Sequence, residues 1–286
     1  MRTGLFAILA FLFLAPAGEA AWKAQRVTVL EGFETPESVV VDQDSGMVYV
    51  SNVDTRAGGP WAEDAQGFIS RLKPEGEMDD LRWVTSTPEM PIHGPKGMCI
   101  HDRTLYVADI DRVLRISLRN RGDVSRIRFI RARRLNDMAT DGDNVYVSDT
   151  GAGLIYRVEP RGYGHKRIEA PPYVNGITFH EKRLFAVSWA LHEVYDLSRP
   201  EGEQRLNVSR ALRNPDGIEI LGDRSVLVSD HTGGTVVVIP PSGGSVYSLL
   251  EGLETPADIG VDRERNLLYV PLFGAGRVAV YRLISE

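Results

Sequence analysis

The sequence contains very little cysteine, with Cys99 as its single example among 286 residues. An internal disulfide is therefore excluded, and the fold must be stabilised by its core and by closure of the chain. Cys99 lies in the apolar run at residues 97–100. We expect it to be a buried core residue rather than a nucleophile.

Long hydrophobic runs are also scarce, because only residues 5–14, after Arg2, form one. That run is too short to span a bilayer comfortably, and the small residues at 15–21 are typical of a signal-peptide cleavage site. We predict a signal peptide over residues 1–20 and one domain over 21–286, with a retained N-terminal anchor as the alternative. No later segment is apolar and long enough to cross a membrane. The sequence thus predicts an exported protein, either periplasmic or secreted.

An excess of positive charge is lacking, since 33 Lys and Arg stand against 39 Asp and Glu. A slightly acidic chain argues against general nucleic-acid binding. The arginine-rich stretch at 119–134 partly alternates with apolar residues, which indicates a strand with one solvated face. We expect a monomer whose partner is a small molecule.

Helical periodicity is missing after the N-terminal run, and a repeat takes its place. The phrase LEGFETPESVVVD at 30–42 returns as LEGLETPADIGVD at 250–262. Weaker copies of the phrase begin at residues 94, 134, 173 and 214. Short runs rich in Val, Ile, Tyr and Leu follow each copy and are separated by turn residues. This pattern is typical of β-strands. A spacing of about 40 residues suits one four-stranded propeller blade.

The repeat predicts an all-β fold, a six-bladed β-propeller. The last unit, residues 253–286, supplies only three strands, while residues 27–30 match the outer strand of the fifth unit at 248–250. We therefore expect the N-terminal strand to join the last blade and close the ring, because a closed ring needs no polar caps. A β-sandwich is the main alternative, but it would not predict so regular a repeat.

The residues just before the six inner strands should meet around one mouth of the central tunnel. That position holds, in order, Glu37, Lys96, Asn136, Asn175, Asp216 and Ala257. The next position holds Ser38, Gly97, Asp137, Gly176, Gly217 and Asp258. Two carboxylates and two amides suit a hard divalent cation, Ca²⁺ first, with Mg²⁺ or Mn²⁺ as alternatives. Hydrogen-bonded turns, which Asn and Asp commonly make before strands, are the other interpretation.

The blade starts PES, LND, VNG and PDG, in this order, resemble those of the gluconolactonase/regucalcin (senescence marker protein) family of calcium-dependent six-bladed propellers, to which paraoxonases and organophosphate hydrolases are related. The resemblance covers essentially the whole mature chain. It implies that Glu37, Asn136, Asn175 and Asp216 hold a divalent metal and contact the substrate. It also implies hydrolysis of a lactone or other ester, with Asp216 as the base. Paraoxonases have a His where this chain has Lys96, which argues against a His-based mechanism.

Lys96 has two interpretations that the sequence leaves open. A divalent ion nearby would disfavour its charged form, so that it acts as a base or contacts an anionic substrate. Alternatively it forms a structural ion pair with Asp137 or Asp258. These two aspartates follow Asn136 and Ala257 in the sequence and are themselves predicted to contact the substrate.

The loops between the second and third strands should lie over the same mouth. They include an insertion at residues 53–67 that carries Trp61, and they include Trp189 and His231. Because long loops on a rigid scaffold often carry specificity, we predict that these three side chains bind substrate. A plain surface loop is the alternative for the insertion, and His93 and His231 are secondary candidates for a base.

The sequence therefore favours an exported metal-dependent hydrolase of a lactone-like or ester substrate, with Asp216 and Lys96 as its catalytic candidates. Propellers host many functions, so the fold alone does not decide. The alternative is a non-enzymatic propeller that binds a small ligand or an envelope protein on the face that carries this mouth, called the top face below.

Overall fold

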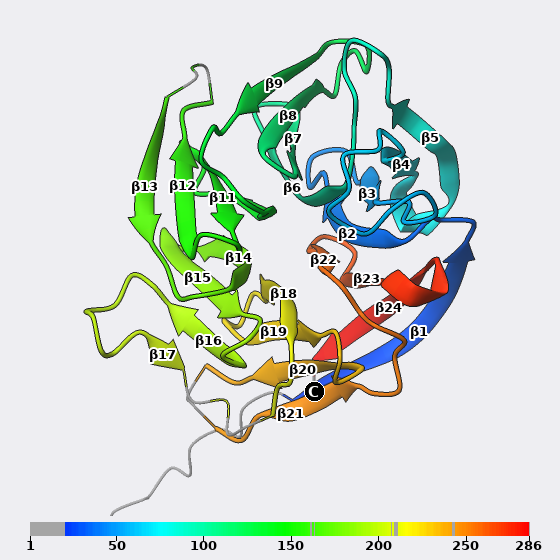
Figure 1. Ribbon diagram of the computed structural model, residues 1–286. Coiled ribbons are helices and arrows are strands. Elements are labelled where there is room, and N and C mark those ends of the chain that lie inside the picture. Colours follow the sequence, from blue (N-terminus) through cyan, green and yellow to red (C-terminus); the bar gives the residue numbers. More distant parts are fainter. Residues whose placement is uncertain are drawn as a thin grey trace, which may run out of the picture.

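The computed structural model describes residues 21–160, 162, 164–206, 208, 211–241 and 244–285, so the predicted signal peptide lies outside the described residues. Six four-stranded antiparallel sheets form the blades of a ring (Figure 1), which confirms the predicted six-bladed β-propeller. The described part has two short 3-10 helices and no α-helix: η1 (Pro74–Gly76) and η2 (Phe273–Ala275). None of its helices has the length and apolar character needed to cross a membrane.

Each blade runs from an inner strand at the tunnel to an outer strand at the rim. Blade one contains β2 (Pro36–Val41), β3 (Val48–Asn52), β4 (Phe68–Leu72) and β5 (Met78–Thr85). Blade two contains β6 (Pro95–His101), β7 (Thr104–Asp109), β8 (Arg112–Ser117) and β9 (Val124–Arg128). Blade three contains β10 (Leu135–Thr140), β11 (Val145–Asp149), β12 (Leu154–Val158) and β13 (His165–Glu169).

The second half of the ring repeats this order. Blade four contains β14 (Val174–His180), β15 (Arg183–Ser188), β16 (Glu193–Asp196) and β17 (Arg205–Leu206). Blade five contains β18 (Pro215–Ile220), β19 (Val226–Asp230), β20 (Thr235–Ile239) and β21 (Tyr247–Leu250). Blade six contains β22 (Gly260–Asp262), β23 (Leu267–Leu272), β24 (Arg277–Ser285) and, as its outer strand, β1 (Trp22–Glu31).

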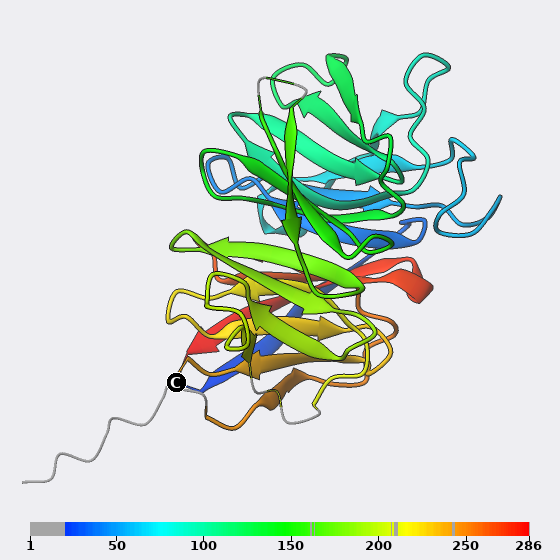
Figure 2. The ribbon, with the colours of Figure 1, turned by 60° about the vertical axis from the view of Figure 1, so that its left-hand side comes forward.

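The two ends of the chain close the ring as predicted. Strand β1 pairs antiparallel with β24, with Trp22 opposite Ser285 and Glu31 opposite Arg277 (Figures 1 and 2). The strand is longer than the predicted 27–30 and contains a register shift between Arg26 and Thr28. Closure leaves blade six with a full set of four strands.

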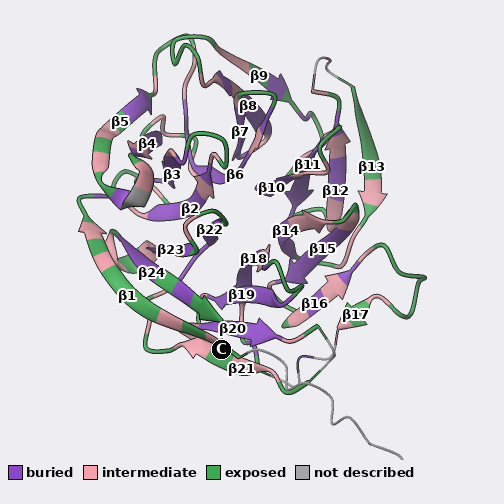
Figure 3. Cartoon of the chain, turned by 180° about the vertical axis from the view of Figure 1, so that it is seen from behind, coloured by how far each residue is buried: buried purple, intermediate pink, exposed green. Residues whose placement is uncertain are grey.

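The hydrophobic core lies between neighbouring blades. The second strands β11 and β19 are buried along their whole length, whereas the outer strand β13 is largely exposed (Figure 3). This explains why the second runs of the repeat read as nearly continuous apolar stretches, because strands buried on both faces need no polar alternation.

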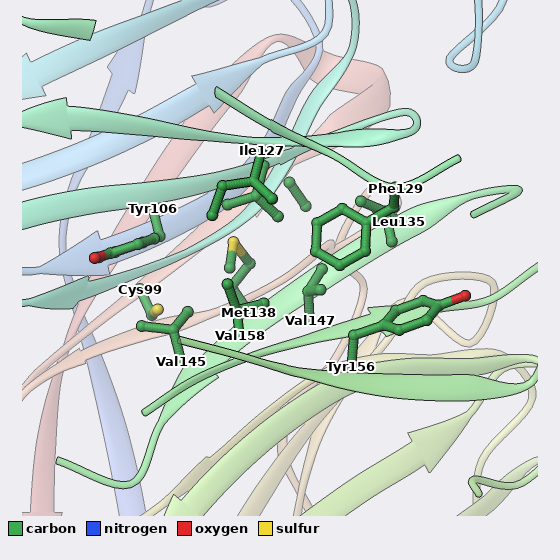
Figure 4. Close-up of a cluster of buried hydrophobic side chains, with 12 residues drawn as sticks. Cys99, Tyr106, Ile127, Phe129, Leu135, Met138, Val145, Val147, Tyr156 and Val158 are labelled. Atoms are coloured by element: carbon green, nitrogen blue, oxygen red, sulfur yellow. The ribbon is translucent and has the colours of Figure 1, made fainter. Parts of the chain in front are cut away.

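Cys99 is part of this core, as the sequence predicts. It packs with Tyr106, Met138 and Val145 in a cluster between blades two and three (Figure 4). Burial raises the pKa of its thiol well above the ordinary value. A buried neutral thiol is a poor nucleophile, so a catalytic role for Cys99 is not supported.

Acidic residues at the ends of the second strands fix the entries of the inner strands. Asp109 accepts a hydrogen bond from the backbone N–H of Gly94 at 2.8 Å, and Asp149 accepts one from that of Arg134 at 3.0 Å. In blade five, Asp230 accepts hydrogen bonds from the backbone N–H groups that precede β18. The recurring acid thus holds in place the segment that leads into the tunnel mouth.

Candidate functional site

A β-bulge opens the inner strand at the top mouth in blades one to five. A register shift with the second strand occurs in five blades, at Pro36/Ser38, Pro95/Met98, Leu135/Met138, Val174/Ile177 and Pro215/Ile218. Every predicted ligand position lies inside one of these intervals. A bulge adds one residue to the strand and redirects side chains, so it presents the ligand positions to the tunnel in a way that simple alternation does not.

Serine hydroxyls from the second strands support these bulges. The hydroxyl of Ser148 accepts a hydrogen bond from the backbone N–H of Asp137 at 2.9 Å and donates to the carbonyl of Asn175 at 2.7 Å. Ser229 makes the equivalent link between blades five and six, donating to the carbonyl of Ala257 at 2.7 Å. Adjacent blade starts are therefore joined directly, which fixes the spacing of the mouth.

Glu37 and Lys96 form a buried ion pair in this mouth. The Lys96 Nζ lies 3.4 Å from Glu37 Oε1, and the two residues are only 2% and 5% exposed, respectively. The other carboxylate oxygen, Glu37 Oε2, is buried without a hydrogen-bond partner in the described chain. Burial raises the pKa of Glu37 to about 7, although Lys96 lowers it. The expected pairing of Lys96 with Asp137 or Asp258 is wrong, because its carboxylate partner is Glu37.

Asp216 lies beside His231 in the same mouth. Its Oδ2 is 3.5 Å from His231 Nδ1, which is within ion-pair distance, yet Nδ1 makes no hydrogen bond to any described residue. The His231 ring packs between Trp189 and Phe273, with centroid distances of 5.3 and 5.6 Å. Sequence reasoning found Trp189 and His231 but missed Phe273, although all three directly follow a second strand.

Asn136 and Asn175 enter the mouth from blades three and four, and both are buried. The side-chain oxygen of Asn175 has no hydrogen-bond partner in the described chain. In the described residues, no three His, Cys, Asp or Glu side chains gather as a metal site. The four predicted ligands are not a cluster of that type, because they combine two carboxylates with two amides. Unpartnered buried oxygens are rare in native proteins, and those of Glu37 and Asn175 fit a hard cation.

The insertion at residues 53–67 lies over the mouth, as predicted. The Lys96 Nζ is 4.4 Å from the centroid of the Trp61 ring, and the Arg134 guanidinium is 5.5 Å from it. His93 anchors the insertion, because its Nδ1 accepts a hydrogen bond from the backbone N–H of Ala65 at 3.0 Å. This contact gives His93 a structural task.

Asp137 and Asp258 lie deeper in the tunnel than the predicted ligands. They line a cavity of about 670 Å³ that also includes inner-strand ends at the opposite mouth. Asp137 accepts a hydrogen bond from the Ile177 N–H at 2.6 Å, and Asp258 accepts one from the Ser38 hydroxyl at 2.6 Å. Burial raises the pKa of both carboxyls well above the ordinary range. Substrate contact by these two residues stays a prediction.

Comparison with known proteins finds solved structures with a similar fold. No protein-family description and no curated protein matches the chain. The chain is similar to a catalytically inactive His-to-Ala variant of virginiamycin B lyase from Staphylococcus aureus with quinupristin, at 13% identity over 92% of this chain and 100% of that chain, with a TM-score of 0.62. A streptogramin B lyase matches at 11% identity over 94% and 98% of the two chains, with a TM-score of 0.62.

A protein provisionally assigned as a gluconolactonase matches at 18% identity over 96% of each chain, with a TM-score of 0.66. At such identities the likeness shows a shared propeller fold and no more. The fold thus occurs in a lyase and in a protein assigned as a lactonase. A relation to regucalcin or to the paraoxonases stays a prediction from the sequence.

Proposed function

We propose that this protein is an exported, metal-dependent hydrolase of a lactone-like or ester substrate, with its active site at the top mouth. One observation carries the proposal. Glu37 Oε2 and Asn175 Oδ1 are both buried there without a hydrogen-bond partner in the described chain, in the mouth that also holds Asp216. Buried acceptors of this kind need a donor or a cation. The fold shared with a lyase and an assigned gluconolactonase is consistent with such chemistry.

Glu37, Asn136, Asn175 and Asp216 would hold the ion, since carboxylate and amide oxygens are the ligands that Ca²⁺ prefers. A bound divalent cation polarises a substrate carbonyl and lowers the pKa of water.

The side chains around this set have distinct tasks in the proposed reaction. Asp216 accepts the proton of the attacking water as general base. Lys96 is held between Glu37 and the Trp61 ring and places a positive charge close to the oxyanion that develops. Trp61, on its anchored insertion, covers Lys96 and limits the access of water.

A direct test uses the purified protein with Ca²⁺ and a panel of lactones and esters, before and after chelation. We expect turnover that chelator abolishes, that Ca²⁺ restores and that Asn175→Ala lacks. Asn120→Ala removes an exposed amide from the outer β8–β9 loop and is the matched control. The proposal fails when the wild-type protein binds no divalent ion at micromolar concentrations.

A second candidate function is metal-independent binding of a small ligand on the top face. It is favoured by the ion pair at 3.4 Å between Lys96 and Glu37, because the ammonium group can neutralise the carboxylate without a metal. Ligand binding that is indifferent to chelator, without turnover of any ester, would support this alternative.

A further inference from the structure

One position at the top mouth, directly after the second strand of each blade, differs between the two halves of the ring. The residue directly after the second strand is hydrogen-bonded through its backbone to the segment before the inner strand, as in Val53, Trp189, His231 and Phe273. Blades one to three have small or aliphatic residues there, and blades four to six have aromatic rings: Val53, Ile110 and Thr150, then Trp189, His231 and Phe273. The aromatic half lies next to Asp216.

The three rings of blades four to six form one continuous wall. The His231 centroid lies 5.3 Å from that of Trp189 and 5.6 Å from that of Phe273, distances at which aromatic rings attract one another. Each of the three residues is partly exposed, so the wall can still receive a ligand. His231 extends the wall down to the Asp216 carboxylate, 3.5 Å away. A group stacked on this wall would therefore reach the predicted reaction centre.

Two polar contacts hold the wall in position. The Asn214 side-chain amide donates to the backbone carbonyl of Trp189 at 3.1 Å. The Thr255 hydroxyl accepts from the backbone N–H of Gly274 at 2.7 Å, directly after Phe273. A pre-organised surface loses less entropy on binding than a mobile one.

The other side of the mouth carries positive charge. Arg134 lies 5.5 Å from the centroid of Trp61 and is exposed. Within the described chain its guanidinium has no carboxylate partner, whereas Lys96 on the same ring is paired with Glu37. Arg134 is therefore a cation that is available to an incoming anion.

We propose that the substrate is an ester or lactone that carries both an aromatic ring and a negatively charged group. The ring stacks on Trp189, His231 and Phe273, and the anionic group lies beside Arg134. This inference rests on the proposed hydrolase function and adds its substrate class. Phe273 and Arg134 determine the specificity of the site without taking part in bond cleavage.

Binding experiments separate recognition from chemistry. Calorimetry with benzoate, benzamide and cyclohexanecarboxylate measures the contributions of charge and ring independently of turnover. We expect benzoate to bind most tightly. Phe273→Leu should weaken benzoate by about two- to tenfold and leave cyclohexanecarboxylate unchanged. Arg134→Gln should weaken benzoate by about two- to fivefold and leave benzamide unchanged, as suits an exposed charge.

Matched controls carry the same substitutions elsewhere. Phe179→Leu changes a phenylalanine that lines the cavity at the opposite mouth, and Arg126→Gln removes an exposed charge from outer strand β9. Both should bind benzoate as the wild type does. Equal affinity for the three probes, or equal losses in the controls, would overturn the inference.

Hydrolysis of 4-acetoxybenzoate, phenyl acetate and 3-acetoxypropanoate then distinguishes the two proposals. Preference for 4-acetoxybenzoate that Phe273→Leu and Arg134→Gln reduce supports both. Turnover of all three esters at equal efficiency overturns the substrate class and retains the hydrolase. The expected binding pattern without turnover of any ester overturns the hydrolase and the ester as its substrate, and retains only the top face as a binding site for an aromatic anion.

Discussion

Blades one and six begin with nearly the same sequence but place different side chains at the mouth. Thr35 and Thr255 both have left-handed backbone conformations, with φ of 54° and 47°. The copies then touch each other, since the Asp258 N–H donates to the Glu37 carbonyl at 2.9 Å. Yet Glu37 places a carboxylate in the mouth, whereas Ala257 is fully buried and carries no ligand atom. The repeat therefore preserves the backbone, and single side chains within it determine which blades supply a ligand atom.

The largest expected effect comes from breaking the closure that brings these two copies together. Deleting residues 22–31 removes β1 and leaves β24 as an unpaired edge. We expect the loss of most of the folding free energy, which is about 5–15 kcal/mol for a typical domain. Thermal unfolding should show a lower and less cooperative transition, while deletion of residues 1–20 alone should not. A melting temperature within a few degrees of that of the full chain would refute the role of closure.

Converting blade one to the sequence of blade six should remove the ion. Glu37→Ala deletes a predicted ligand, and we expect calcium affinity to fall by at least about 100-fold, because changes outside the ligand shell already cost up to about that much. The variant also leaves Lys96 without its carboxylate, which should destabilise the fold by about 3–5 kcal/mol. Glu219→Ala, at the opposite mouth, is the control and should retain the affinity. Unchanged calorimetric titrations for Glu37→Ala would exclude Glu37 as a ligand.

The acid in blade one, which blade six lacks, should also make the stability of the protein depend on pH. Folding raises the pKa of Glu37 from 4.5 to about 7, so between these values the folded state holds a proton that the unfolded state has released. The free energy of unfolding should therefore fall as pH rises through this window, by up to about 3 kcal/mol. Urea unfolding of chelated protein should show this slope, and Glu37→Gln should make it shallower, because Asp137 and Asp258, whose pKa values are also raised, still contribute. Equal slopes in both proteins would contradict the assignment.

The smallest effects are expected at the serines that link neighbouring blade starts. Ser148→Ala and Ser229→Ala should each cost about 1–2 kcal/mol in urea unfolding, because each removes buried hydrogen bonds. Ser148 supports the backbone beside Asn136 and at Asn175, which are two predicted ligand positions. Ser229 supports the backbone beside one predicted ligand, Asp216, and at Ala257, which is no ligand. Ser148→Ala should therefore weaken calcium binding more than Ser229→Ala. The opposite order would show that ligand positions do not depend on these links.

Much of the architecture could be predicted because it depends on spacing. Runs of apolar residues at regular intervals predict six blades, and the missing strand of the last unit predicts closure by β1. The same logic places Trp61, Trp189 and His231 on loops at the mouth, since strand direction alone determines which loops lie there.

Other features could not be predicted because they depend on local departures from regular geometry. The bulges at the starts of the inner strands interrupt the two-residue alternation on which side-chain direction is predicted. Lys96 pairs with Glu37 across two blades, a choice that spacing does not determine. Phe273 could not be predicted as a mouth residue, because it ends the apolar run LLYVPLF and there resembles a core residue of a strand.

Determination of a structure with calcium present tests the central claim most directly. The account predicts one ion at the top mouth, with oxygens of Glu37, Asn136, Asn175 and Asp216 at about 2.3–2.6 Å from it. A mouth that retains only the Lys96–Glu37 ion pair at saturating calcium, with no ion between these four side chains, would contradict it.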